Sequence, residues 1–281
     1  RSARSQISKN ASQKSNSGQK IMLIDSHCHI HDENFPIDHA EVFIKMETNG
    51  IKKAICVGVD LVNSQQAVSF TKKYQKPELF AAIGVHPHEA KDFNIKTDLS
   101  KLEKLARSAK VVAIGEIGLD YFYNHSPKEV QAEVLLAQLK LAQKLDLPVS
   151  FHVRGAFDDF WPIFDQAERE GGKIRGVVHS FTDSIENLQK ALERDLFIGV
   201  NGISTFVKKP EELEMFAQIP LNKILLETDA PFLAPKGKRG NSNQPAWIKL
   251  IAEDLSKKQD KSLEEIAQIT TQNTQKLFNI Q

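Results

Sequence analysis

The sequence predicts an α/β protein, a single-domain (β/α)8 TIM barrel with a disordered N-terminal leader, and three observations support this fold class. Eight short apolar runs alternate with longer amphipathic segments along the 281 residues, as in such a barrel. The runs are rich in Val and Ile and continuous, as expected of parallel strands buried on both faces. The first run ends in histidines and lacks the glycine-rich phosphate loop usual in a doubly wound open sheet, which is the alternative fold.

The predicted strands lie at 22–27, 53–59, 79–85, 111–118, 147–153, 175–181, 196–202 and 224–231. The clearest helical pattern is at 128–146, where apolar residues recur at spacings of three and four. We expect Asp183 to cap a helix that runs to Arg194. Two helices, 245–257 and 262–278, close the chain, and Ser262 with Glu265 gives the start pattern of the last one.

Residues 1–21 differ in composition from the predicted barrel domain at 22–281. The segment 1–20 is rich in Ser, Asn and Gln and carries five basic residues, no acidic residue and no apolar periodicity. It cannot bury enough apolar surface to order itself, and it lacks the apolar core of a secretory signal. We therefore expect a disordered leader or a remnant before a natural start at Met22, with an organelle transit peptide as the alternative.

Composition excludes several classes of protein. The formal net charge is +1, so no field of the whole molecule favours nucleic acid or membrane, and the apolar runs are too short to span a bilayer. The two cysteines, Cys28 and Cys56, exclude a disulfide framework and favour a reducing, cytoplasmic location. Cys28 is expected to be a buried residue that packs in the core. The expected oligomeric state is a monomer.

Histidines and carboxylates occupy the ends of five predicted strands. In a barrel these ends open onto one mouth, so residues far apart in sequence converge there. The set comprises His27, His29, Glu116, His152, His179 and Asp229. Four imidazoles and two carboxylates suit Mg, Mn or Zn with open coordination positions. Because six donors exceed the need of one ion, the sequence predicts two divalent metal ions, for which a separation of about 3.5–4 Å is usual.

The motifs that contain these residues resemble the TatD-type metal-dependent deoxyribonucleases of the amidohydrolase-like barrels. They stand in family order as DSHCHI (25–30), GVHPHEA (84–90), GEIGLDY (115–121), FHVR (151–154), HSF (179–181) and ETDAP (227–231). Relatives of the dihydroorotase type usually hold their metals with a carbamylated lysine on the fourth strand, whereas here Glu116 stands in that place.

The resemblance implies a role for each of the six residues. His27, His29 and Asp229 would hold one ion, His152 and His179 the other, and Glu116 would bridge them. Asp229 and Glu116 would be the catalytic residues, with Asp229 taking a proton from the attacking water, whose pKa the ions lower.

Further polar residues near the mouth have two interpretations each. The resemblance assigns His86 to substrate phosphate, with a structural hydrogen bond as the alternative. Arg154 is a candidate phosphate clamp or a partner in a salt bridge. His31 is expected to be a loop residue, with ligand or substrate contact as the alternative. Asp25 is either an acceptor for the N–H of a ligand imidazole or simply a turn residue. His88 is expected to contact a residue that supports a metal ligand, or to face solvent.

The expected activity is divalent-metal-dependent cleavage of DNA, by an exonuclease or an end-processing or repair nuclease that acts on single strands or ends. Lys236, Lys238 and Arg239 are candidate backbone contacts, and Tyr121, Phe122, Tyr123 and Trp247 are candidates to stack bases. The alternatives are an ester or amide hydrolase, including an aminoacyl-tRNA deacylase, and a barrel without catalysis. The family's usual Arg-Asn-Glu-Pro is Ser-Asn-Gln-Pro at 242–245, and Gly155, Ser180 and Asp183 also depart from the pattern.

Overall fold

Eight parallel strands form the centre of the molecule, and the strands follow one another around the sheet in chain order. The computed structural model describes residues 21–35 and 37–281, so residues 1–20 of the expected leader lie outside the described residues. The strands are β1 (Leu23–Cys28), β2 (Ile51–Val57), β3 (Glu78–Ile83), β4 (Val111–Asp120), β5 (Val149–Arg154), β6 (Gly176–Val178), β7 (Phe197–Val200) and β8 (Ile224–Leu226).

The ring closes between β1 and the segment that follows β8. A parallel bridge pairs Cys28 with Ala230. The His29 amide donates to the Ala230 carbonyl at 2.6 Å, and the Asp229 amide donates to the His27 carbonyl at 2.9 Å. These bonds complete the predicted (β/α)8 TIM barrel, and three of the residues that make them, His27, His29 and Asp229, belong to the predicted metal set.

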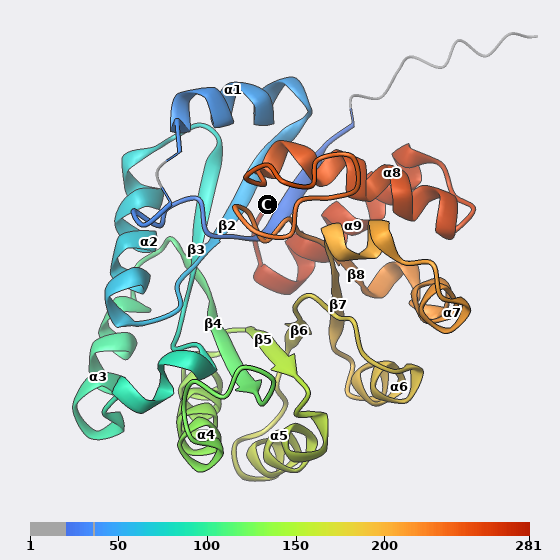
Figure 1. The fold of residues 1–281 in the computed structure, drawn as a ribbon. Helices are drawn as coiled ribbons and strands as arrows, with labels where there is room; N and C mark the ends of the chain where they lie inside the picture. The colour runs from blue at the N-terminus through green and yellow to red at the C-terminus, as the bar shows by residue number, and fades with distance from the viewer. Residues whose placement is uncertain (1–20, 36) are drawn as a thin grey trace, which may run out of the picture.

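Helices surround the strands, as Figure 1 shows. They are α1 (His39–Thr48), α2 (Leu61–Lys73), α3 (Ile95–Leu105), α4 (Lys128–Leu145), α5 (Phe157–Gly171), α6 (Ile185–Glu193), α7 (Pro210–Gln218), α8 (Ile248–Lys258) and α9 (Leu263–Phe278). Short 3-10 turns, η1 (Pro87–Asp92), η2 (Gly202–Phe206), η3 (Leu221–Lys223) and η4 (Pro245–Trp247), occupy parts of the loops. Within the described residues, no helix is both long enough and apolar enough to cross a bilayer.

The core has an outer layer between strands and helices and a smaller inner layer. The inner layer takes alternate strand residues such as Ile55, Val57 and Phe80, together with Leu277 and Phe278 at the end of α9. Alternate residues of a barrel strand face inward. The end of α9 therefore packs with the interior of the barrel.

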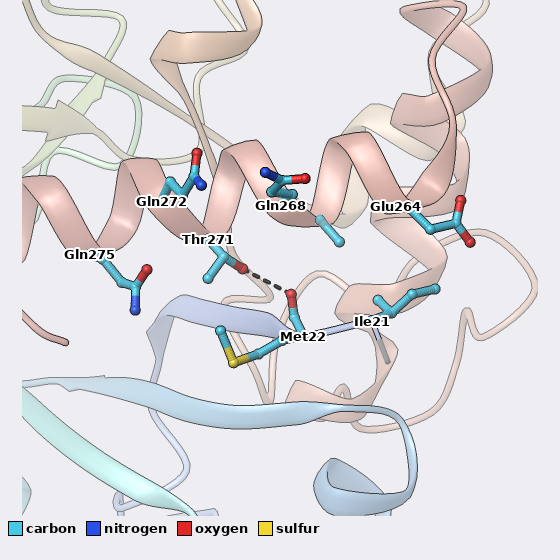
Figure 2. A pocket seen from close by; sticks show the side chains of 8 residues that line it. Ile21, Met22, Glu264, Gln268, Thr271, Gln272 and Gln275 are labelled. Carbon is cyan, nitrogen blue, oxygen red and sulfur yellow. Dashed lines mark hydrogen bonds between the residues drawn. The ribbon is translucent and has the colours of Figure 1, made fainter. Parts of the chain in front are cut away.

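The amino-terminal end of the barrel, which we call the barrel floor, is fastened to α9. Figure 2 shows the groove there, with the Thr271 hydroxyl directed at the Met22 backbone just before β1. The Thr271 hydroxyl donates to the Met22 carbonyl at 2.9 Å. The Asn273 amide donates to the carbonyls of Leu221 and Ile224 at 2.9 and 2.8 Å, where β8 begins. Side chains of α9 thus satisfy backbone groups that precede two strands.

Two predicted helix starts have different outcomes. Ser262 caps α9 as expected, accepting from the Glu265 amide at 3.1 Å. The prediction that Asp183 caps α6 is wrong by one residue, because the Ser184 hydroxyl accepts from the Asn187 amide at 3.2 Å. The Asp183 carboxylate instead receives the Asn187 side-chain amide at 2.7 Å. The predicted helix at 245–257 is also divided, into η4 and α8.

Candidate metal centre

The six predicted strand-end residues meet at the carboxyl-terminal mouth of the barrel. On the β1 side, the Nε2 atoms of His27 and His29 lie 3.2 Å apart. His29 Nε2 is 3.3 Å from Asp229 Oδ1, and His27 Nε2 is 3.3 Å from Glu116 Oε2. His27, His29 and Asp229 form one group whose ligand atoms all lie within 4.8 Å of one another.

On the opposite side of the Glu116 carboxylate, the other oxygen faces further imidazoles. His152 Nδ1 lies 2.8 Å from Glu116 Oε1, and His179 Nε2 lies 3.7 Å from the same oxygen. His86, Glu116 and His152 form a second group of potential ligands. His179 Nε2 is also 3.8 Å from Asp229 Oδ1, so its imidazole faces both carboxylates. Glu116 thus lies between two clusters of nitrogen donors.

Each of the four predicted ligand imidazoles has an oxygen near its other ring nitrogen. The pairs are His29 Nδ1 with the Val57 carbonyl at 2.7 Å, His27 Nδ1 with Ser150 Oγ at 3.4 Å, His152 Nε2 with Asp120 Oδ2 at 3.0 Å, and His179 Nδ1 with Glu227 Oε1 at 2.9 Å. Contacts of this kind fix the orientation of a metal-binding imidazole. The remaining nitrogen of each ring is directed at the shared carboxylates.

Sequence analysis did not identify Asp120 and Glu227, although both stand inside the quoted motifs. Asp120 lies four residues after Glu116, and Glu227 lies two residues before Asp229. Both side chains are fully buried, and a buried carboxylate requires partners. The sequence signal that could have identified them is that each stands a few residues from a predicted metal ligand within the same motif. A third group of potential ligands contains His27, His179 and Glu227, but Glu227 lies at the nitrogen of His179 that faces away from Glu116.

The two shared carboxylates supply negative charge that favours cation binding. Burial disfavours a charged Glu116, but the imidazoles of His179 and His27 hold the pKa of its carboxyl well below its usual range. Burial likewise opposes ionisation of Asp229, yet a hydrogen bond from His29 lowers its pKa. Burial opposes protonation of His179, but Glu227 and Glu116 raise its pKa to about 10, so this imidazole is protonated at neutral pH and must release its proton when it binds a cation. Both shared carboxylates are therefore ionised at neutral pH, and imidazole nitrogen with carboxylate oxygen is a donor set that suits divalent ions.

The backbone is shaped to bring these groups together. The β1–β2 register shifts between Asp25 and Cys28, which interrupts the simple alternation of faces along β1. In β4, a side chain at Gly118 would place its Cβ 1.7 Å from the His152 carbonyl oxygen. Only glycine permits this close approach of β4 to β5, and the approach sets the position of His152 relative to Glu116.

Asp229 is held in a left-handed backbone conformation, with φ of 59°, which is unfavourable for a residue other than glycine. The adjacent Thr228 is fixed by Asp25, whose carboxylate accepts the Thr228 amide at 2.9 Å and also the Thr228 hydroxyl. Asp25 therefore supports the Asp229 turn, and it contacts the His27 backbone amide, at 3.3 Å, instead of a ligand imidazole.

The structure also places the remaining predicted histidines. His31 lies in the loop after β1, as expected, and its Nε2 contacts Asn63 Oδ1 at 3.1 Å. His88 Nε2 contacts Asp120 Oδ2 at 2.9 Å, beside the His152 contact. Cys28 is fully buried, as expected of a packing residue.

His86 faces the centre as a hydrogen-bond donor. Its Nδ1 accepts the His88 backbone amide at 3.2 Å, so the proton of the neutral ring lies on Nε2. That atom lies 3.7 Å from Glu116 Oε1. Burial and the neighbouring His152 hold the pKa of His86 well below its usual range. A neutral imidazole with an N–H directed into the centre results.

Basic residues around the mouth lie against aromatic rings. The Arg154 guanidinium lies 4.2 Å from the ring centroid of Phe122. After β8, Lys238 Nζ is 5.4 Å from the Trp247 ring. In the same loop Asn243, which the chain shares with the family pattern, donates to the Thr228 carbonyl at 2.8 Å. The loop is thus tied to the residue that precedes Asp229, although its flanking residues depart from the family.

An eight-stranded parallel barrel with clustered imidazoles and carboxylates at its carboxyl-terminal mouth defines the class of metal-dependent barrel hydrolases. The model of the TatD-related DNase family matches residues 24–279. The chain belongs to this family and is a metal-dependent hydrolase.

Named relatives cover nearly the whole chain. The uncharacterized metal-dependent hydrolase YabD of Bacillus subtilis is 35% identical over 92% of this chain and 100% of its own length. The 3′-5′ ssDNA/RNA exonuclease TatD of Citrobacter rodentium is 32% identical over 92% of this chain and 98% of its own length. The crystal structure of the TatD homologue YjjV from Escherichia coli superimposes with a TM-score of 0.86 at 31% identity, covering 94% of this chain and 100% of that one.

Proposed function

We propose that the chain is a phosphodiesterase that cleaves DNA, at single strands or ends, through a water activated at a two-metal site. The observation that carries this proposal is the position of Glu116, whose two carboxylate oxygens face separate groups of imidazoles. A carboxylate between two donor groups is the arrangement that a bridged pair of ions requires. Membership of a family in which one relative is named an exonuclease of single-stranded DNA and RNA supports the substrate class.

In this proposal His27, His29 and Asp229 would hold one divalent ion, His152 and His179 would hold the other, and Glu116 would contact both. Such ions lower the pKa of water and offset the charge that develops on a phosphate. His179 is kept in orientation by Glu227, and His152 by Asp120, so neither imidazole must reorganise when substrate binds.

Asp229 is the proposed proton acceptor. Its side chain is 13% exposed against 5% for Glu116, so of the two carboxylates it is the more accessible to an incoming water. Its pKa is depressed, so it is ionised and able to accept a proton at neutral pH. His86 would donate its Nε2 proton to a phosphate oxygen, in agreement with the role that the resemblance implied.

The test is the degradation of end-labelled single-stranded DNA by the purified protein with Mg²⁺ or Mn²⁺. We expect shortened products that disappear when EDTA is added and return when the metal is restored. RNA and a model carboxylic ester are assayed in parallel, with Asp229→Asn as the inactive control. DNA that stays intact with every metal while the ester is cleaved would refute the nuclease proposal in favour of an esterase.

A further inference from the structure

Two exposed aromatic side chains lie side by side on the loop between β4 and α4. Phe122 is 66% exposed and Tyr123 is 51% exposed, and their ring centroids lie 4.9 Å apart, edge to face. Arg154, at the end of β5, places its guanidinium over both rings, 4.2 Å from the first centroid and 4.8 Å from the second. Because these rings stay largely exposed, they bury little apolar area and contribute little to the stability of the fold.

The backbone beneath these rings is nevertheless firmly held. Asp120 Oδ1 accepts the amides of Phe122 and Tyr123 at 2.9 and 3.0 Å. The buried Gln131 side chain accepts the Asp120 amide at 2.8 Å and donates to the Ser126 carbonyl at 2.8 Å. Buried polar side chains therefore fix a turn whose aromatic residues point into water, which is how a binding surface is kept in position.

The same carboxylate connects this turn to the metal centre. Asp120 Oδ2 contacts His152 Nε2 at 3.0 Å and His88 Nε2 at 2.9 Å. The Tyr123 ring centroid lies 5.5 Å from that of His88, which in turn lies 4.3 Å from that of His86. The Tyr123 ring is thus separated only by the His88 imidazole from His86, which in the proposed function contacts substrate phosphate.

We propose that Phe122, Tyr123 and Arg154 form a stacking platform for a nucleobase of the nucleotide next to the scissile phosphate. This inference rests on the proposed function, and it identifies side chains that bind a base of the substrate beside that site. Aromatic faces stack on any base and so give affinity without sequence preference. The planar guanidinium adds a surface that stacks and carries the positive charge that a nucleic-acid strand attracts.

A base fits this surface better than a protein partner does. The platform comprises only three side chains, far less than the surface that a stable protein interface buries. It adjoins the metal centre, and it carries a cation. Phe206 on η2 is a similar ring outside the platform. It is 37% exposed, and the Arg239 guanidinium lies 6.0 Å from its centroid. It does not belong to the turn that Asp120 holds.

The experiment compares the double variant Phe122→Ala/Tyr123→Ala with the wild type on two substrates. One is a labelled single-stranded oligonucleotide, and the other is the same strand with abasic sugars flanking the scissile phosphate. We expect KM for the base-bearing strand to rise about 10-fold, equivalent to about 1.4 kcal/mol. The value of kcat should stay within about twofold of the wild type, since the binding is lost equally from ground and transition states.

The abasic strand should show no difference in KM between wild type and double variant. Tyr123→Phe, which keeps the ring, and Phe206→Ala, which removes an exposed ring elsewhere, should both match the wild type. An equal rise in KM on both substrates, no rise on either, or an equal effect of Phe206→Ala would overturn the platform.

If the wild type cleaves no nucleic acid, the proposed function fails, and the platform is judged separately by fluorescence anisotropy in Ca²⁺. Tighter binding of the base-bearing strand than of the abasic strand by the wild type, lost in the double variant, would support the platform. Equal binding of the two strands would overturn it.

Discussion

The mouth and the floor of this barrel use polar residues in opposite ways. At the mouth, imidazoles and carboxylates from five strands are crowded within a few ångströms, including His27 and His179 with rings stacked at 3.6 Å. At the floor, the neutral side chains of Thr271 and Asn273 on α9 satisfy backbone carbonyls, as Thr271 does for Met22 (Figure 2). The mouth gathers carboxylates and imidazoles into a donor set that suits a divalent ion, whereas these two α9 side chains have their hydrogen-bond partners within the protein. The mouth should therefore govern activity and the floor stability.

The largest expected effect is at the mouth. Asp229→Asn removes the proposed proton acceptor and one negative charge while keeping the side-chain shape. We expect kcat on single-stranded DNA to fall about 10³-fold, with a thermal midpoint close to that of the wild type by circular dichroism. Unfolding of the variant at room temperature would show that Asp229 is structural.

A smaller effect, on metal affinity, is expected from replacing Glu227, whose carboxylate lies beside His179. Glu227→Gln keeps the size of the side chain but removes the charge next to His179 Nδ1, so metal affinity should fall about 10-fold. Calorimetric titration with Mn²⁺ measures the change. Glu168→Gln is the matched control at the floor, where Glu168 accepts the Ile174 amide at 2.8 Å. Equal weakening in both variants would contradict a specific role for Glu227.

At the floor, Thr271→Val removes the hydroxyl that donates to Met22. The variant keeps the shape of the side chain, so we expect only the loss of one hydrogen bond, about 1 kcal/mol in the free energy of unfolding. Urea denaturation gives that value, and kcat on DNA should remain that of the wild type. A large loss of activity without a loss of stability would invert the proposed division between mouth and floor.

The smallest effect concerns an ion cluster at the floor. Lys223 and Lys173 lower the pKa of Asp195 to about 2, and Lys173 Nζ lies 2.9 Å from its carboxylate. Because the folded pKa is depressed, the stabilisation is present above the unfolded pKa of about 4 and is lost as the pH falls through the folded pKa of about 2. The pair is exposed, so we expect Asp195→Asn to cost less than about 1 kcal/mol at pH 7 and progressively less as the pH falls toward 2. A constant difference across that range in urea denaturation would contradict this assignment.

The sequence predicts the barrel because continuous Val- and Ile-rich runs specify parallel strands, and it predicts the position of the six strand-end residues because topology alone brings strand ends together. It overestimates the length of β6 and β8, which end at Val178 and Leu226. The polar residues that follow, His179 and Asp229, lie beyond these ends, although their amides still donate to the carbonyls of Phe151 and His27. The local pattern cannot show where hydrogen bonding between strands stops.

Other features depend on three-dimensional contacts that no spacing reveals. The orientation of each imidazole is set by a partner distant in sequence, as Val57 is for His29. Asp25 shares the alternation of β1 but is engaged by Thr228, 203 residues away. The exposure of Phe122 follows from a turn fixed by Asp120, whose own role depends on His152. These contacts become visible only once the chain is folded.

We expect the residues gathered at the mouth to hold a pair of divalent cations. Equilibrium dialysis of the purified protein against Mn²⁺ or Zn²⁺, followed by elemental analysis, tests it most directly. Two tightly bound ions per chain are expected. A chain that retains one ion or none at saturating metal would contradict it.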